Sequence, residues 1–69
     1  MRRGSVTDFD DERGLGTVTD DSGDTFPFHC VEIADGRRSI AVGTPVEFDV
    51  VAKLGRYEAA RLTARTADG

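Results

Sequence analysis

Apolar side chains recur at every second position over short segments of this chain, and that period constrains the fold more than any other feature. The clearest example is residues 44–52, where Val46, Phe48 and Val50 alternate with acidic side chains. Such alternation is typical of a strand with one buried and one exposed face. Weaker versions, rich in Val, Thr and Phe, occupy residues 4–9, 13–19, 25–29 and 57–64. We therefore expect five short strands and no amphipathic helix.

Turn-forming residues separate the five segments. Asp, Ser and Gly dominate residues 20–24, and these residue types bond to the nearby backbone or take positive φ. Other connections are a polar turn at residues 10–13, a helical turn at 30–33, a longer loop at 34–43 and a hairpin at 53–56. Short strands joined in this way predict an all-β fold, a small antiparallel β-barrel that is closed or nearly closed. Its expected core comprises Val6, Val18, Phe26, Phe28, Ile33, Ile40, Val46, Phe48, Val50 and Leu62.

The length of 69 residues predicts one domain over residues 1–69, with its core at about residues 4–64 and a frayed end at 65–69. A domain of this size buries only ~60% of its unfolded surface, so its core is thin. The single cysteine, Cys30, cannot form an internal disulfide, and we expect it to be a partly buried core residue. No cluster of Cys and His predicts a metal site, and no motif predicts a cofactor.

Nothing in the sequence predicts export or membrane insertion. Arg2 and Arg3 lack the apolar run that follows the charges of a signal peptide. No apolar stretch approaches the ~20 residues that a membrane helix needs, and a lone cysteine fits a reducing compartment. We therefore expect a soluble, cytoplasmic protein without membrane contact.

The net charge of −4 is unevenly distributed. Residues 1–35 carry 3 basic and 9 acidic side chains, whereas residues 36–69 carry 6 basic and 4 acidic ones. The acidic balance argues against tight electrostatic capture of phosphates, but a local basic patch can differ from the total. The acidic groups at residues 8–12 and 20–24 lack the ligand spacing of a calcium loop, so we expect solvated turn carboxylates there.

An ordered set of short motifs resembles the cold-shock domain family, as found in bacterial cold-shock-like proteins. The motifs are Gly4-x-Val6-x-x-Phe9, Arg13-Gly14-x-Gly16-x-Val18-Thr19, Asp21-x-Gly23, Phe28-His29, Ile33, Ser39-Ile40, Gly43-x-x-Val46-x-Phe48, Gly55, and Ala59 or Ala60. They run in order through nearly the whole chain. The resemblance implies a five-stranded antiparallel barrel of the oligonucleotide-binding (OB-fold) type and a role in binding single-stranded RNA or DNA.

In that family, two signatures on the second and third strands place aromatic rings on an outward face, where each ring stacks on a base for ~1–3 kcal/mol. This chain keeps the glycines of the first signature but has lost most of the rings. The replacements are Leu15 and Thr17 in the first signature, Pro27 and Cys30 in the second, and Asp8 in place of a tryptophan on the first strand. The resemblance therefore implies a degenerate surface.

The residues that the resemblance assigns to nucleic-acid binding are Phe9, Arg13, Leu15, Thr17, Pro27 and His29, with a rim of Arg37, Arg38 and Arg56. Losing four or five stacking rings removes most of the about 8 kcal/mol of a micromolar complex, so weak and sequence-tolerant binding is expected. For His29, plain surface packing is the alternative to base contact. For the rim arginines, the alternative to phosphate contact is solvated loop charge.

Protein interaction and catalysis are the two other kinds of function to compare with nucleic-acid binding. A protein-interaction module on the same barrel is the alternative, because Leu15, Pro27 and Leu54 present aliphatic groups beside an acidic half. Catalysis is not expected, since His29 has no evident base partner and no nucleophile or metal set accompanies it. A monomer is favoured over a dimer.

Overall fold

Five strands form a single antiparallel sheet in this computed structural model, which describes residues 2–34, 36 and 39–65. The strands are β1 (Arg2–Asp10), β2 (Leu15–Asp20), β3 (Thr25–His29), β4 (Pro45–Lys53) and β5 (Arg56–Ala64), and a 3-10 turn, η1 (Cys30–Glu32), follows β3. The order across the sheet is β3-β2-β1-β4-β5. The predicted strands and helical turn are confirmed, with strand ends displaced by at most two residues.

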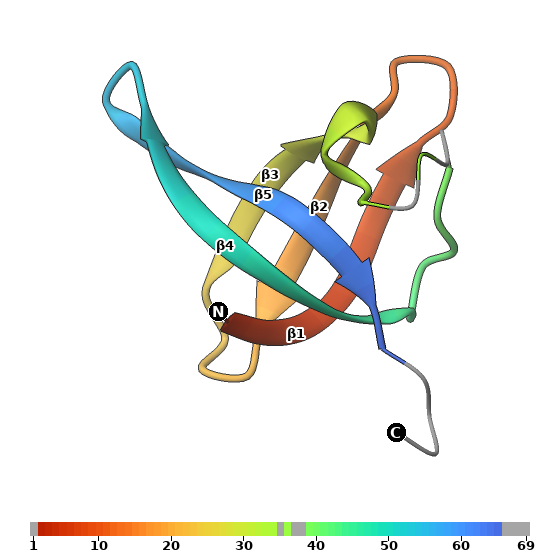
Figure 1. Ribbon diagram of the computed structural model, residues 1–69, viewed down its shortest axis with the longest axis horizontal. Helices are drawn as coiled ribbons and strands as arrows, with labels where there is room; N and C mark the ends of the chain where they lie inside the picture. Colours follow the sequence, from red (N-terminus) through yellow and green to blue (C-terminus); the bar gives the residue numbers. More distant parts are fainter. Residues whose placement is uncertain (1, 35, 37–38, 66–69) are drawn as a thin grey trace.

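The sheet curls until its two outer strands meet. β3 and β5 pack against each other, and β5 crosses in front of β3 in Figure 1. Ile33, just after η1, forms a parallel bridge with Leu62 of β5. The N–H of Ala34 donates to the Leu62 carbonyl oxygen at 2.7 Å. These contacts join the ends of the sheet, and the all-β barrel of OB-fold type is confirmed.

A bulge in β1 interrupts the two-residue period. Val6 pairs with Val18, but the next pair is Asp8 with Thr17, so one extra residue, Thr7, is accommodated between them. Thr7 and Asp8 are therefore both exposed. Beyond the bulge, Phe9 pairs with Gly16 and faces inward, because the strand has gained one residue.

A second irregularity shapes β5. Glu47 pairs with Thr63 and Asp49 with Ala60, so two residues of β5 stand opposite the single residue between them on β4. Arg61 takes a φ of 55° at this point. Its N–H donates to the Glu32 carboxylate at 3.3 Å, which ties the bulge to η1.

The core lies inside the curl of the sheet. It consists of Val6, Val18, Phe26, Phe28, Ile33, Val46, Phe48, Ala59 and Leu62, with Phe9, Cys30, Ile40 and Val50 packed against it. All ten predicted core positions belong to this set, although Ile40 and Val50 are only partly buried. The buried alanines at 59 and 60 were not predicted, because alternation identifies large apolar side chains more readily than small ones.

Candidate nucleic-acid interface

The outer face of β1, β2 and β3 is built from cross-strand rows of side chains. Leu15 stands opposite His29 on one side and Asp10 on the other, and Thr17 stands between Pro27 and Asp8. The intervening residues of β2 and β3 are buried, so these rows point outward. The structure therefore brings together four of the residues singled out from the sequence, which are Leu15, Thr17, Pro27 and His29.

Leu15 and His29 form the apolar end of this face. Leu15 is 40% exposed, which is high for a large aliphatic side chain, and His29 is also exposed. Directly opposed residues of an antiparallel pair have Cβ atoms about 4.5–5.5 Å apart. An imidazole and an isobutyl group at that spacing offer a small surface on which a flat ring can pack.

The turn between β1 and β2 holds this end of the face in place. Gly14 has a φ of 66°, and its N–H donates to the Asp10 carbonyl oxygen at 2.8 Å. The Cys30 N–H donates to the Gly14 carbonyl oxygen at 2.7 Å, which fixes the start of β2 beside the end of β3. A Cβ atom at position 14 would lie 2.9 Å from the Cys30 sulfur. Cys30 therefore serves packing, in agreement with its predicted role.

Acidic side chains border the face along β1. Asp8 and Asp10 occupy the ends of the two rows and are exposed. The Asp10 carboxylate accepts hydrogen bonds from the backbone N–H groups of Glu12 and Arg13 at 3.0 and 3.3 Å. It also lies 3.8 Å from the Nε of Arg13, a largely exposed cation. The positive charge of Arg13 is thus offset at the edge of the face.

Threonine hydroxyls lie beyond the rows. The Oγ1 atoms of Thr7 and Thr19 are 3.0 Å apart, and Thr7 Oγ1 also donates to the Thr17 carbonyl oxygen at 3.4 Å. Thr19 in turn pairs with Thr25 of β3. This part of the face is polar and uncharged.

The remaining predicted site residues do not join the rows. Phe9 faces the core side, where its ring stacks on Phe28 with centroids 5.9 Å apart. Arg56 belongs to the β4–β5 hairpin, where it pairs with Lys53. Arg37 and Arg38 lie outside the described residues.

Sequence reasoning missed the environment of Asp20, which was predicted to be a solvated turn carboxylate. Asp20 is only 7% exposed. Its carboxylate accepts hydrogen bonds from Arg2 Nη1 and from the N–H groups of Ser22 and Asp24, each at 2.9 Å. Burial alone would raise the pKa of Asp20, but the hydrogen bonds from Asp24, Arg2 and Ser22, with the charge of Arg2, bring it below its ordinary value.

Two further features were sought in the part of the chain that the structure describes, namely a metal-ligand cluster and a membrane-spanning helix. Within residues 2–34, 36 and 39–65, no three His, Cys, Asp or Glu side chains gather in a way that could hold a metal ion. The same residues include no helix with the length and apolar character needed to cross a membrane.

Comparison with known proteins agrees with the geometry. The search of curated proteins returned no match. A family model described as the 'Cold-shock' DNA-binding domain matches residues 2–65, a span that includes all five strands and the outer face of β1–β3. That description corresponds to nucleic-acid binding, the general function implied by the sequence motifs. The chain therefore belongs to the cold-shock domain family.

Proposed function

We propose that this protein binds single-stranded RNA or DNA, weakly and with little sequence preference, across the outer face of β1–β3. One observation carries the proposal. The outward-facing pairs Leu15–His29 and Thr17–Pro27, of which only Thr17 is partly buried, lie on the two adjacent strands that hold the family's stacking signatures. The family match covers these strands completely.

A single strand suits such a face better than a duplex. Unpaired bases expose flat faces that can pack on side chains, whereas a duplex hides them within its stack. Leu15, Pro27 and His29 supply apolar or aromatic surface, and Thr17 supplies a hydroxyl. None of these groups reads one particular base edge, so the binding tolerates different sequences.

The same surface explains why the binding is weak. Among Leu15, Thr17, Pro27 and His29, only His29 has an aromatic ring, and aromatic stacking contributes about 1–3 kcal/mol per base. A micromolar complex requires about 8 kcal/mol. The carboxylates of Asp8 and Asp10 border the rows and repel phosphates. We therefore expect dissociation constants in the high micromolar range.

A nuclear magnetic resonance titration tests the proposal. Short pyrimidine-rich DNA and RNA are added at low salt, with a duplex of equal length as the comparison. We expect progressive amide shifts at Leu15, Thr17 and His29 with the single strands and much smaller shifts with the duplex. Absence of shifts at millimolar oligonucleotide would reject nucleic-acid binding by this face.

Restoring aromatic rings gives a second test. The double variant Leu15→Phe with Thr17→Phe should bind single strands about tenfold more tightly, because each ring adds stacking surface. Both positions point outward, so the larger side chains extend into solvent. Val42→Phe adds a ring at an exposed position of the loop before β4 and serves as the matched control. Equal affinity in all three proteins would place the site elsewhere.

A protein-interaction role is the second candidate, and one observation favours it. Val31 is 78% exposed on η1, two residues after His29, and Leu15 and Pro27 are exposed on the outer face of β2 and β3. Exposed aliphatic groups beside charged ones suit a protein surface. Capture of a protein partner that persists after nuclease treatment and is lost in Val31→Asp would favour this role. A captured signal that nuclease abolishes would count against it.

A further inference from the structure

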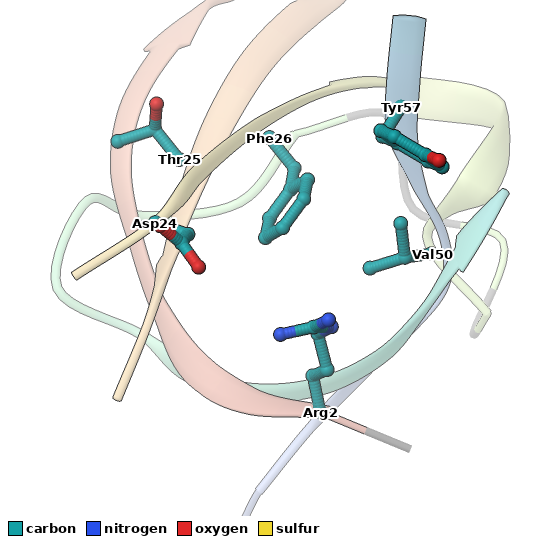
Figure 2. Close-up of a pocket in the computed structure, with 6 residues that line it drawn as sticks. All are labelled: Arg2, Asp24, Thr25, Phe26, Val50 and Tyr57. Atoms are coloured by element: carbon teal, nitrogen blue, oxygen red, sulfur yellow. The ribbon is translucent and has the colours of Figure 1, made fainter. Parts of the chain in front are cut away.

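A cleft of about 590 Å³ opens at one end of the barrel, away from the Leu15–His29 pair. It is lined by Arg2, Asp24, Thr25, Phe26, Val50 and Tyr57 (Figure 2). Arg2 is the first residue of β1, and Asp24 ends the turn between β2 and β3. The other lining residues come from the start of β3, the middle of β4 and the start of β5. The volume falls within the about 300–1,000 Å³ typical of small-molecule sites.

The cleft presents flat surfaces. Phe26 is nearly buried at its base, and the guanidinium carbon of Arg2 lies 5.4 Å from the centre of the Phe26 ring. Arg2 is fixed there by its hydrogen bond to Asp20 at 2.9 Å. Tyr57 is 65% exposed, and Figure 2 shows its ring and Val50 across the opening from Asp24. An exposed aromatic ring and a fixed guanidinium plane are the groups on which a planar ligand stacks.

The polar groups of the cleft are complementary to a base edge that carries both N–H donors, an amino group among them, and an acceptor atom. Figure 2 shows the Asp24 carboxylate and the Arg2 guanidinium both directed toward the central space. A carboxylate accepts from amino and imino N–H groups, whereas a guanidinium donates to carbonyl oxygens and carries five N–H donors. Guanine has a carbonyl oxygen next to an imino N–H and an amino group on one edge. Thymine and uracil have no amino group to offer to Asp24.

The cleft adjoins the end of the proposed strand-binding face at one residue, Thr25. Thr25 lines the cleft and also pairs with Thr19 at the end of the outer rows. Pro27 and His29 follow on the same side of β3, so the face runs from His29 to Thr25 over about 13 Å. A single strand that lies along β3 and continues past Thr25 would meet the edge of the cleft.

We propose that this cleft is a nucleobase pocket that takes a guanine from the strand bound on the outer face. The inference rests on the proposed function and adds to it a specific subsite with a base preference. Tyr57 and Arg2 act as stacking groups, and Asp24 acts as the acceptor that distinguishes guanine from thymine.

Tyrosine fluorescence provides a direct readout. Tyr57 is the sole tyrosine and the chain has no tryptophan, so its emission reports on this cleft alone. A hexathymidylate is compared with a hexamer in which one terminal thymidine is replaced by deoxyguanosine, at either end in turn. Free tyrosine amide corrects for light absorbed by the oligonucleotide. We expect stronger quenching and about tenfold tighter binding for one of the two guanine-containing hexamers.

Variants separate the pocket from the rest of the surface. Binding is measured by anisotropy of a labelled oligonucleotide, since Tyr57→Ala removes the fluorophore. Tyr57→Ala should abolish the about tenfold advantage of guanine, and Asp24→Asn should reduce it while leaving hexathymidylate binding unchanged. Leu54→Ala, at a fully exposed position of the same hairpin outside the cleft, is the control and should keep the advantage. If Tyr57→Ala fails to fold, Asp24→Asn carries the test.

A shift map distinguishes the failure of this inference from the failure of the proposed function. Shifts at Thr17 and His29 without shifts at Phe26 and Tyr57, together with equal affinity for both kinds of hexamer, would overturn the pocket alone. Absence of shifts on both surfaces would overturn both proposals. Guanine-dependent shifts at Phe26 and Tyr57 together with shifts at Thr17 and His29 would support the pocket. The same guanine-dependent shifts without any at Thr17 and His29 would overturn the proposal that the guanine belongs to a strand bound on the outer face.

Discussion

The rings of Phe9 and Phe28 stack with their centroids 5.9 Å apart and their planes 19° from parallel. They belong to β1 and β3, which do not pair with each other, and the strand between them contributes Gly16. Phe28 lies directly over that glycine, whose hypothetical Cβ would be 2.5 Å from the Phe28 Cζ atom. Because Gly16 has no side chain, the Phe28 ring can extend across the inner face of β2 and reach Phe9.

Gly16→Ala should destabilise the barrel. The added methyl group would meet both Phe28 and the Asp8 carbonyl oxygen, the latter at 2.8 Å, and the backbone atom cannot rotate away. Overpacking of this kind costs about 1–3 kcal/mol. Urea denaturation at neutral pH measures the loss. Thr17→Ala, one residue further along β2 on the outward side, is the control and should change the free energy of unfolding much less.

Arg2 and Asp20 form an ion pair with an Nη1 to Oδ2 distance of 2.9 Å, and the carboxylate is nearly buried. The pKa of Asp20 is lowered in the folded protein: burial opposes this shift, and the hydrogen bonds from Asp24, Arg2 and Ser22 outweigh it. Because the folded-state pKa is below the unfolded one, the contribution to stability is present above the ordinary aspartate pKa of about 3.9. It is lost as the pH falls through the lower folded-state value.

The pH dependence of Asp20→Asn checks this assignment. The variant should be less stable than the natural protein at neutral pH, and the difference should shrink as the pH falls below about 4. Urea midpoints measured from pH 7 to pH 2 give the curve for each protein. Asp21→Asn removes the same formal charge from an exposed neighbour and should show a smaller effect. A constant difference down to pH 2 would contradict the assignment.

Leu54 and Gly55 form the two-residue loop between β4 and β5, with φ values of 48° and 83°. Positive φ at both positions is typical of a type I′ turn, in which asparagine followed by glycine is favoured. This conformation costs about 1–2 kcal/mol for leucine. The Leu54 side chain is fully exposed, so no packing compensates for that cost. Leu54→Asn should therefore raise the free energy of unfolding by about 1 kcal/mol.

Thermal denaturation of three proteins tests the turn prediction. A gain of about 1 kcal/mol corresponds to an increase of about 4–8 °C in the melting temperature of a domain this small. Leu54→Ala should leave the melting temperature nearly unchanged, because alanine has the Cβ atom that opposes positive φ but lacks the amide with which asparagine hydrogen-bonds locally. An equal gain from both variants would attribute the effect to lost surface hydrophobicity instead.

The fold was predictable from local patterns, and its departures from those patterns were not. Alternation and turn residues identified all five strands, since each strand must bury one face. The bulge at Thr7 adds a residue without changing composition, so the inward direction of Phe9 could not be inferred. The burial of Asp20 depends on Arg2, which lies 18 residues away in the sequence and approaches only when the sheet forms.

The candidate site was also predictable only in part. The outward positions of Leu15, Thr17, Pro27 and His29 were predicted because side chains alternate between the two faces along β2 and β3, and these strands carry the family's two signatures. The cleft beside Tyr57 was not predicted. Its lining residues come from four strands and the β2–β3 turn, and they meet only because the sheet curls. No short sequence motif predicts that curl.

The charge of Asp8 gives a last test of the outer face. Asp8 pairs with Thr17 and is exposed at the edge of the rows, so its carboxylate repels phosphates that approach them. Asp8→Lys should strengthen binding of single strands about tenfold at low salt, since each charge contact is worth about 1 kcal/mol in water. The affinity should also fall more steeply with salt concentration, because the new lysine releases counterions when it meets a phosphate.

Asp21→Lys makes the same change of net charge in the β2–β3 turn and is the control. Titrations of both variants from about 20 mM to about 200 mM salt compare their affinities. An equal gain in affinity from Asp21→Lys would mean that net charge governs binding. That result would contradict the assignment of the outer face of β1–β3 as the contact surface.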